Sequence, residues 1–205
     1  SNQIETCNIQ NTQQSAIRLS GDSDQNSVNA TTIAHIASYG IECWASSATP
    51  GNDNFIYGNT IYDVWDSGVV LNWQNGGTLQ NNTIHHTATD QDGRACNGGG
   101  EPLTLLAGVW ISATVDANIV GNTIYENGNT TYGINASGIY LAGDATSNVI
   151  RNNDIHDNPG NGITVVGDGT VSNTLSANEI YNNRGLGIDL GNDGVTPNDV
   201  GDADT

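Results

Sequence analysis

The chain contains the stretch Asn153-Asp154-Ile155, and nine positions after its asparagine it continues with Gly162-Ile163. The same pattern occurs as Asn59-Thr60-Ile61 with Gly68-Val69 and as Asn178-Glu179-Ile180 with Gly187-Ile188. With variations it recurs seven times along the chain. A repeat with a period of about 20 to 50 residues is typical of a solenoid, in which each repeat buries its apolar face against its neighbours.

Within each repeat, apolar residues alternate with polar ones, which predicts short strands with one buried face. Aligning the repeats places one isoleucine of each in a single column: Ile9, Ile33, Ile61, Ile84, Ile124, Ile155 and Ile180. A second aliphatic column holds Ile17, Ile41, Val69, Val109, Ile139, Ile163 and Ile188. A further apolar residue, such as Ile56 or Ile150, stands three positions before the marker asparagine and indicates a third strand. These features predict an all-β fold, a parallel β-helix of about seven three-strand coils.

The asparagines fit the same geometry, because stacked side-chain amides can hydrogen-bond from coil to coil in a ladder. One column holds Asn59, Asn82, Asn122, Asn153 and Asn178, and another holds Asn26, Asn54, Asn148 and Asn173. Asparagine and glycine also tolerate the left-handed backbone that we expect at tight corners. We therefore assign these residues a structural role.

The chain resembles the right-handed parallel β-helix repeats of the pectate-lyase-like superfamily, which are found in large secreted bacterial proteins. The resemblance rests on Asn-x-Ile-[Tyr/His], on Gly-Ile-x-[Leu/Val], and on the closing run Arg184-Gly-Leu-Gly-Ile-Asp-Leu-Gly-Asn-Asp-Gly-Val-Thr-Pro-Asn-Asp199. It implies a right-handed, single-stranded coil and an extracellular or cell-surface location. It does not imply one activity, since the superfamily includes polysaccharide lyases, hydrolases, epimerases, phage tailspikes and adhesins.

The net charge of the chain limits the classes of partner that it can bind. Twenty-two acidic residues face four arginines and no lysine, so the formal net charge is -18 over 205 residues. Such a field repels nucleic acid and anionic membranes, and it opposes polyanionic glycans unless Ca²⁺ neutralises them. A neutral glycan remains compatible. No stretch approaches the roughly 20 apolar residues of a membrane helix. Because the chain lacks an initiator Met and starts within the pattern, we expect a trimmed part of a longer secreted protein.

The burial and pairing of the three cysteines are predicted from their places relative to the repeat. Cys7 occupies the marker-asparagine column and Cys43 an inward column, so we expect both to be buried rather than joined in a disulfide. Cys96 lies outside the repeat, and either a free thiol or a paired one fits its position.

The repeat is interrupted twice at one corner. The distance from asparagine to glycine is 9 in the regular coils, 26 in coil four (Asn82 to Gly108) and 16 in coil five (Asn122 to Gly138). This predicts a β-helix domain over 1–191 with insertions at 87–107 and 127–137, followed by an acidic tail over 192–205. Adjacent coils stack about 4.8 Å apart, so the insertions should lie side by side. Long loops on a regular solenoid usually mark its working face.

Ionisable and aromatic residues gather at these insertions, and two interpretations compete. In the first, the chain is a polysaccharide lyase, epimerase or glycosidase, and exposed aromatic rings stack on sugars. Its catalytic candidates are His85, His86, Asp90, Asp92, Arg94, Tyr125 and Glu126. Its substrate-binding candidates are Trp110, Tyr140, Tyr125 and His85. A glycosidase would draw its two carboxylates from Asp90, Asp92 and Glu126.

The second interpretation is structural, and we favour it. A tyrosine or histidine recurs at one outward position, as Tyr62, His85, Tyr125, His156 and Tyr181, including in coils without insertions. Repetition of this kind predicts a stack that stiffens the sheet. The leucines of the first insertion would then cover Val70, Trp110 and Tyr140.

The tail and the two ends of the chain leave further alternatives. The tail carries Asp193, Asp199, Asp202 and Asp204, which fit either a Ca²⁺ site or, as we favour, a solvated acidic segment. Neither end shows an amphipathic helical cap, so flanking sequence covers the open strand edges or other subunits pair with them head to tail.

The sequence therefore favours a non-catalytic extracellular β-helix module, structural or adhesive. Its predicted partners are a polysaccharide or cell-surface glycan and further copies of itself, in a filament. The alternative is a polysaccharide-active enzyme centred on the two insertions.

Overall fold

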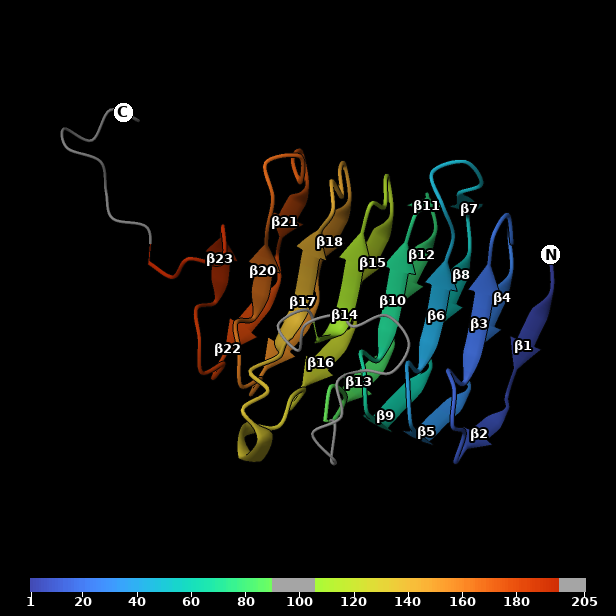
Figure 1. Ribbon diagram of the computed structural model, residues 1–205, viewed down its shortest axis with the longest axis horizontal. Coiled ribbons are helices and arrows are strands. Elements are labelled where there is room, and N and C mark those ends of the chain that lie inside the picture. Colours follow the sequence, from blue (N-terminus) through green and yellow to red (C-terminus); the bar gives the residue numbers. More distant parts are fainter. Residues whose placement is uncertain (90–105, 196–205) are drawn as a thin grey trace.

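The computed structural model describes residues 1–89 and 106–195, and within them the chain winds into stacked coils of three short strands (Figure 1). Three parallel sheets of seven strands each run along the length of the molecule. The coils follow one another from the N-terminus at one end of the rod towards the C-terminus at the other. The predicted parallel β-helix of about seven coils is confirmed.

Each coil contributes one strand to each sheet. The first sheet consists of β1 (Gln3–Glu5), β4 (Ser27–Asn29), β8 (Phe55–Tyr57), β12 (Thr78–Gln80), β15 (Asn118–Val120), β18 (Val149–Arg151) and β21 (Thr174–Ser176). The second consists of β2 (Asn8–Gln10), β5 (Thr32–Ile36), β9 (Thr60–Val64), β13 (Thr83–His85), β16 (Thr123–Tyr125), β19 (Asp154–His156) and β22 (Glu179–Tyr181).

The third sheet consists of β3 (Ile17–Ser20), β6 (Ile41–Trp44), β10 (Val69–Asn72), β14 (Ala107–Ser112), β17 (Ser137–Ala142), β20 (Ile163–Val165) and β23 (Ile188–Leu190). Two short strands, β7 (Gly51–Asn52) and β11 (Gln74–Asn75), pair separately at the corner that follows it. The 3-10 helix η2 (Thr130–Tyr132) lies within the second insertion.

The register of the strands is the one that the aligned repeats predict. Ile84 pairs with Ile61 on one side and with Ile124 on the other, and Val109 pairs with Val69 and Ile139. Most members of these columns are buried in one continuous core that runs along the axis. A coil can bury this face only against its neighbours, so the stacking itself forms the core.

The asparagine ladders form as expected. The side-chain oxygen of Asn122 accepts hydrogen bonds from the backbone and side-chain nitrogens of Asn82, both at 2.9 Å, and Asn153 accepts the equivalent pair from Asn122. The structure adds a third ladder that the sequence analysis missed, in which Asn127 bonds to Asn158 and Asn158 to Asn183.

The backbone reason proposed for the marker residues is wrong. The left-handed residues at the corners do not include the ladder asparagines or the marker glycines. In coil five they include Gly121 (φ 66°), before the ladder, and Glu126 (φ 52°), after the strand. The glycines are required by space instead. A Cβ on Gly138 would lie 2.5 Å from the Cγ2 of Ile155 and 2.8 Å from the carbonyl oxygen of Gly162.

One of the cysteine predictions also fails. Cys43 is buried and free, as expected, whereas Cys7 is free but exposed. Cys7 lies in the first coil, where the described chain stacks only one neighbour on it, so its place in the column does not enclose it. Cys96 lies outside the described residues.

Candidate functional site

The described ends of the two insertions meet at the corner between the second and third sheets. The backbone N–H of Gly128 donates to the carbonyl oxygen of Thr87 at 2.7 Å, and the Asn129 side chain donates to the carbonyl oxygen of Thr89 at 2.9 Å. A small apolar cluster joins them: Ala88, Leu106, Ile134 and Ala136. The insertions therefore start side by side, as the spacing predicts.

The tyrosines and histidines of the second sheet form a continuous stack beside this corner. Ring centroids are 5.3 Å apart between Tyr62 and His85, and 4.8 Å apart between His85 and Tyr125. The stack continues from Tyr125 to His156 at 5.0 Å and from His156 to Tyr181 at 4.9 Å. All four pairs lie within 10° of parallel. The predicted stack is confirmed, and its period follows the strand spacing.

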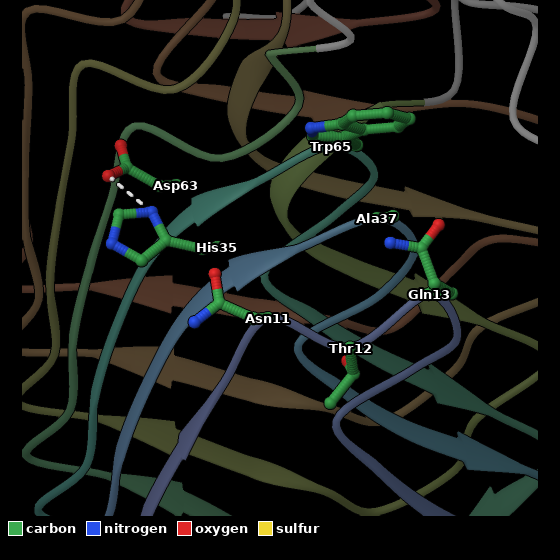
Figure 2. A pocket seen from close by; sticks show the side chains of 7 residues that line it. All are labelled: Asn11, Thr12, Gln13, His35, Ala37, Asp63 and Trp65. Atoms are coloured by element: carbon green, nitrogen blue, oxygen red, sulfur yellow. Dashed lines mark ion pairs between the residues drawn. The ribbon is translucent and has the colours of Figure 1, made fainter.

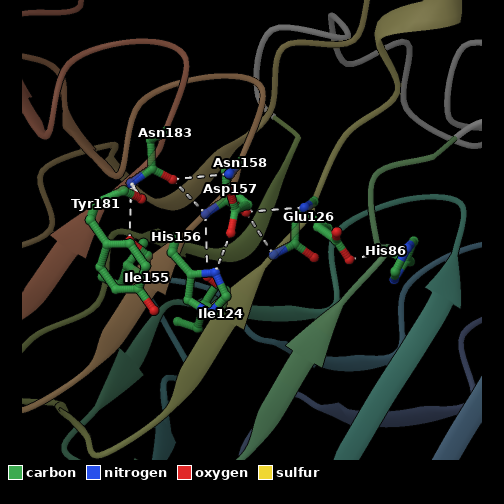
Figure 3. A network of polar contacts seen from close by, with 10 residues as sticks. His86, Ile124, Glu126, Ile155, His156, Asp157, Asn158, Tyr181 and Asn183 are labelled. Atoms are coloured by element: carbon green, nitrogen blue, oxygen red, sulfur yellow. Dashed lines mark hydrogen bonds and ion pairs between the residues drawn. The ribbon is translucent and has the colours of Figure 1, made fainter.

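A second column of side chains follows the stack by one residue, and its backbone is left-handed. Its members are Asn11, His35, Asp63, His86, Glu126, Asp157 and Asn182, with φ between 50° and 59°. The Nε2 of His86 lies 3.3 Å from the Oε2 of Glu126, and the Nδ1 of His35 lies 3.3 Å from the Oδ2 of Asp63 (Figure 3 shows the first pair). We call this column the left-handed ladder.

His85 is a residue of the stack whose pKa is shifted by its surroundings. Partial burial lowers the pKa of its imidazole, and the neighbouring His86 lowers it further. The Nδ1 atoms of the two rings are 2.7 Å apart, so one of them must be unprotonated to accept the hydrogen bond. A neutral imidazole near neutral pH is the state that a general base needs.

The structure thus brings together four of the seven catalytic candidates: His85, His86, Tyr125 and Glu126. Asp90, Asp92 and Arg94 lie outside the described residues. A glycosidase pair is therefore represented here by Glu126 alone. What the four described groups offer chemically is two imidazoles, a phenol and a carboxylate in two adjacent columns along the axis.

Trp110 and Tyr140 do not present the open ring surfaces that the catalytic interpretation requires. They are 7% and 5% exposed, and they pack in a cluster with Val70 and Ala107. Trp44 lies edge-on to Trp110, with centroids 6.0 Å apart. Alternation along a strand predicts that these side chains point away from the core, but it does not say what packs over them.

The corner carries grooves next to the insertions. The first, of about 440 Å³, is lined in coils one to three by Asn11, Thr12, Gln13, His35, Ala37, Asp63 and Trp65 (Figure 2). The second, of about 520 Å³, includes Tyr140, Asn161 and Arg184 in its lining. The sequence analysis missed the first groove, whereas the second includes the predicted residue Tyr140 and part of the predicted insertion at 127–137. The signal that points to the first groove is the short corner loops of the coils before the insertions.

The predicted metal ligands fall mostly beyond what the structure describes. Asp193 is described, whereas Asp199, Asp202 and Asp204 are not. Across residues 1–89 and 106–195, no three histidine, cysteine or acidic side chains are grouped so as to hold a metal ion. The same part of the chain contains no helix of the length and apolarity that a membrane crossing requires.

Solved structures with a similar fold belong to proteins of different function. The periplasmic alginate epimerase AlgG superimposes with a TM-score of 0.68 at 13% identity, over 87% of this chain and 39% of that one. The A-module of the Azotobacter vinelandii mannuronan C-5 epimerase AlgE4 gives 0.67 at 21% identity, over 87% and 46%. The chain thus spans less than half of either epimerase structure.

A Streptococcus pneumoniae surface protein and adhesin, PfbA, gives a TM-score of 0.54 at 12% identity, over 92% of this chain and 67% of that one. No curated protein sequence matches the chain. At these identities the similarities establish the fold alone. A sequence family described as right handed beta helix region matches residues 1–180, which is most of the chain. With its three seven-stranded parallel sheets, the chain belongs to this right-handed β-helix family.

Proposed function

We propose that the chain is a non-catalytic extracellular β-helix module, structural or adhesive, which binds a glycan on its surface. The observation that carries the proposal is the stack of the second sheet. His85 and Tyr125 belong to a series that extends through coils without insertions, so their position follows from the repeat. Each ring covers its neighbour, and the stack leaves little free ring surface for a sugar.

The named functions of the similar structures are compatible with this proposal. PfbA is named as a surface protein and adhesin, and the epimerases are named for alginate and mannuronan. A surface or periplasmic location and a polysaccharide partner are therefore reasonable for this chain as well. The net charge of -18 favours a neutral glycan over an acidic one.

A glycan array followed by product analysis tests the proposal. We expect glycans to be bound and recovered unchanged. Cleavage or epimerisation that disappears in both His85→Ala and Asp92→Ala would replace the proposal with a catalytic function.

The second candidate is a polysaccharide lyase, epimerase or glycosidase at the two insertions. It is favoured by one observation: the His85 imidazole has a lowered pKa and lies against the Tyr125 ring, with the Glu126 carboxylate near His86. In that function His85 accepts a proton from the sugar. Tyr125→Phe then separates the two functions, because it removes the phenol and keeps the stack.

Three other features remain proposals. They are the division into a domain over 1–191 and an acidic tail over 192–205, Ca²⁺ binding by that tail, and head-to-tail association through the open strand edges. Light scattering over a range of concentrations tests the association, and a sample that remains monomeric contradicts it. Melting with and without Ca²⁺ tests the tail, and an unchanged melting temperature contradicts the metal site.

A further inference from the structure

The groove in coils one to three combines the chemical groups that a sugar requires. Asn11, Thr12 and Gln13 come from the corner after β2, His35 and Ala37 from β5 and the residue after it, and Asp63 and Trp65 from β9 and the residue after it. Figure 2 shows the His35–Asp63 pair, the Trp65 indole and the two amides bordering the same hollow. Its volume of about 440 Å³ is within the range of sites for small ligands.

The polar side of the groove is held in place by backbone geometry. Asn11 and His35 have φ of 59° and 55°, and Asp63 has φ of 51°, so the left-handed ladder directs three successive side chains outward. The Nδ1 of His35 lies 3.3 Å from the Oδ2 of Asp63, while the two side chains remain 51% and 40% exposed. Tyr62 meets His35 edge-on at 6.0 Å and restricts the orientation of its ring. The pair is thus ordered and still accessible to a ligand.

The two amides are available for hydrogen bonding. Within the described part of the chain, neither the Asn11 nor the Gln13 side chain has a hydrogen-bond partner, and both residues are exposed. The Thr12 hydroxyl donates to the carbonyl oxygen of Gln14 at 2.7 Å, which leaves its oxygen free to accept. Together they can donate to and accept from several hydroxyl groups.

Trp65 supplies the apolar surface. Its backbone N–H donates to the carbonyl oxygen of Ile36 at 2.9 Å, which fixes the position of the residue. Its indole is partly exposed and, among the described residues, has no aromatic partner stacked on it, in contrast to the rings of the second sheet. Sugar rings present a face of C–H groups that packs against such an indole.

The charges select the class of ligand. Among the described residues that line the groove, His35 and Asp63 are the ionisable ones, and none is a lysine or an arginine. The groove cannot offset the repulsion between an acidic glycan and a chain of net charge -18. A neutral, hydroxyl-rich ligand avoids that cost. Because the lining comes from three consecutive coils, a linear ligand would lie along the axis.

We propose that this groove binds a linear neutral oligosaccharide. Trp65 stacks on a sugar ring, the His35–Asp63 pair binds hydroxyl groups, and the Asn11 and Gln13 amides bind hydroxyl groups of the next sugar. The inference rests on the proposed function because it requires the chain to bind a glycan. It differs by placing the ligand in coils one to three, beside the start of the first insertion, where Thr89 bonds to the carbonyl oxygen of Val64.

The test is titration calorimetry on the whole chain with cellohexaose, mannohexaose, xylohexaose and maltohexaose, and with oligogalacturonate as the charged comparison. The variants are Trp65→Ala and Gln13→Ala in this groove and Arg184→Ala in the second groove, with Trp73→Ala as the matched control. Trp73 is 39% exposed and lies after β10, outside the groove. Gln13 is exposed, so its replacement leaves the core intact even if Trp65→Ala disturbs folding.

We expect at least one neutral hexasaccharide to bind, with affinity reduced about tenfold or more in Trp65→Ala and measurably in Gln13→Ala, and unchanged in Trp73→Ala. Absence of neutral binding, or binding that survives both groove variants, overturns the inference. Loss in Arg184→Ala alone does the same by placing the ligand in the second groove. These outcomes leave the non-catalytic function standing, whereas conversion of a bound hexasaccharide would contradict that function alone.

Discussion

His85 and Tyr125 lie face to face in adjacent coils, with ring centroids 4.8 Å apart and planes inclined by 10°. Tyr62 covers the other face of His85, and His156 covers the other face of Tyr125. Both faces of both rings are therefore occupied by protein. This arrangement gives the pair a structural role. A test of a catalytic role must therefore change the reactive group and keep the stack.

Replacing Tyr125 separates the ring from the phenol. Tyr125→Ala removes two stacked contacts, each contributing about 0.5 to 1.5 kcal/mol, so we expect the free energy of unfolding to fall by about 1 to 3 kcal/mol. Tyr125→Phe keeps both contacts and should be close to neutral. Urea denaturation measures both variants. A phenylalanine variant as unstable as the alanine variant would show that the hydroxyl group, and not the stack, is what matters.

The stability of the chain should depend on the protonation of His85. Its pKa in the folded chain lies below the ordinary histidine value of about 6.5, because burial and the nearby His86 oppose its charge. As the pH falls below about 6.5, the unfolded chain binds a proton that the folded chain does not. The free energy of unfolding therefore decreases with falling pH until the pH passes the folded pKa.

His85→Tyr removes this titration and keeps a ring in the stack, since tyrosine occupies the same column in both adjacent coils. We expect a smaller loss of stability between about pH 7 and pH 5 than in the parent chain. Tyr62→Phe, which leaves His85 in place, is the control and should keep the full loss. Denaturation midpoints measured across this pH range test the prediction. If the midpoint falls equally steeply with pH in both variants, His85 is not the group responsible for the loss.

The loss of stability when a marker glycine is replaced by alanine should depend on how closely the next coil packs against it. In Gly138→Ala the new Cβ would lie 2.5 Å from the Cγ2 of Ile155 and 2.8 Å from the carbonyl oxygen of Gly162, so the coils must separate. Overpacking of this kind costs about 1 to 3 kcal/mol. In Gly187→Ala the nearest atom, in Ile180, is 3.8 Å away, and we expect little change. Thermal melting of both variants measures the contrast, and equal losses would contradict the steric explanation.

The fold could be predicted from sequence because each coil repeats the same local rule. Ile84 falls in a column with Ile61 and Ile124 when the repeats are aligned, and the strands pair in that register. A slip of one residue would turn Ile84 outward, so burial fixes the register strongly. The third asparagine ladder was not predicted because only the later coils carry asparagine at that position, as Asn127 and Asn158 do.

The candidate site was less predictable because it depends on contacts between different coils, which the repeat does not specify. Counting residues located the insertions, and the described ends do meet there. Alternation placed Trp110 outside the coil, but its burial results from neighbours such as Trp44, which belong to other coils. The first groove likewise joins corners from three coils, and no single segment containing Asn11 or Trp65 encodes its shape.

Replacing a ladder asparagine with alanine should destabilise the fold most at the centre of the ladder. The Asn122 amide donates to the carbonyl oxygen of Leu79 and to the side-chain oxygen of Asn153, and its own oxygen accepts two bonds from Asn82, all at 2.9 Å. Asn122→Ala leaves these buried partners without their bonds, and water does not reach them. An unsatisfied buried polar group costs about 1 to 3 kcal/mol, so we expect a total loss of about 3 kcal/mol or more.

Asn178→Ala is the matched variant for Asn122→Ala. Asn178 makes equivalent bonds to Asn153 and to the carbonyl oxygen of Ile150, but it lies in the last coil of the described residues and is only partly buried. Water can replace its amide there, so the loss in unfolding free energy should be clearly smaller. Urea denaturation of both variants measures the difference. If Asn178→Ala is as damaging as Asn122→Ala, burial is not what gives the ladder its strength, and the stacking of amides alone must account for it.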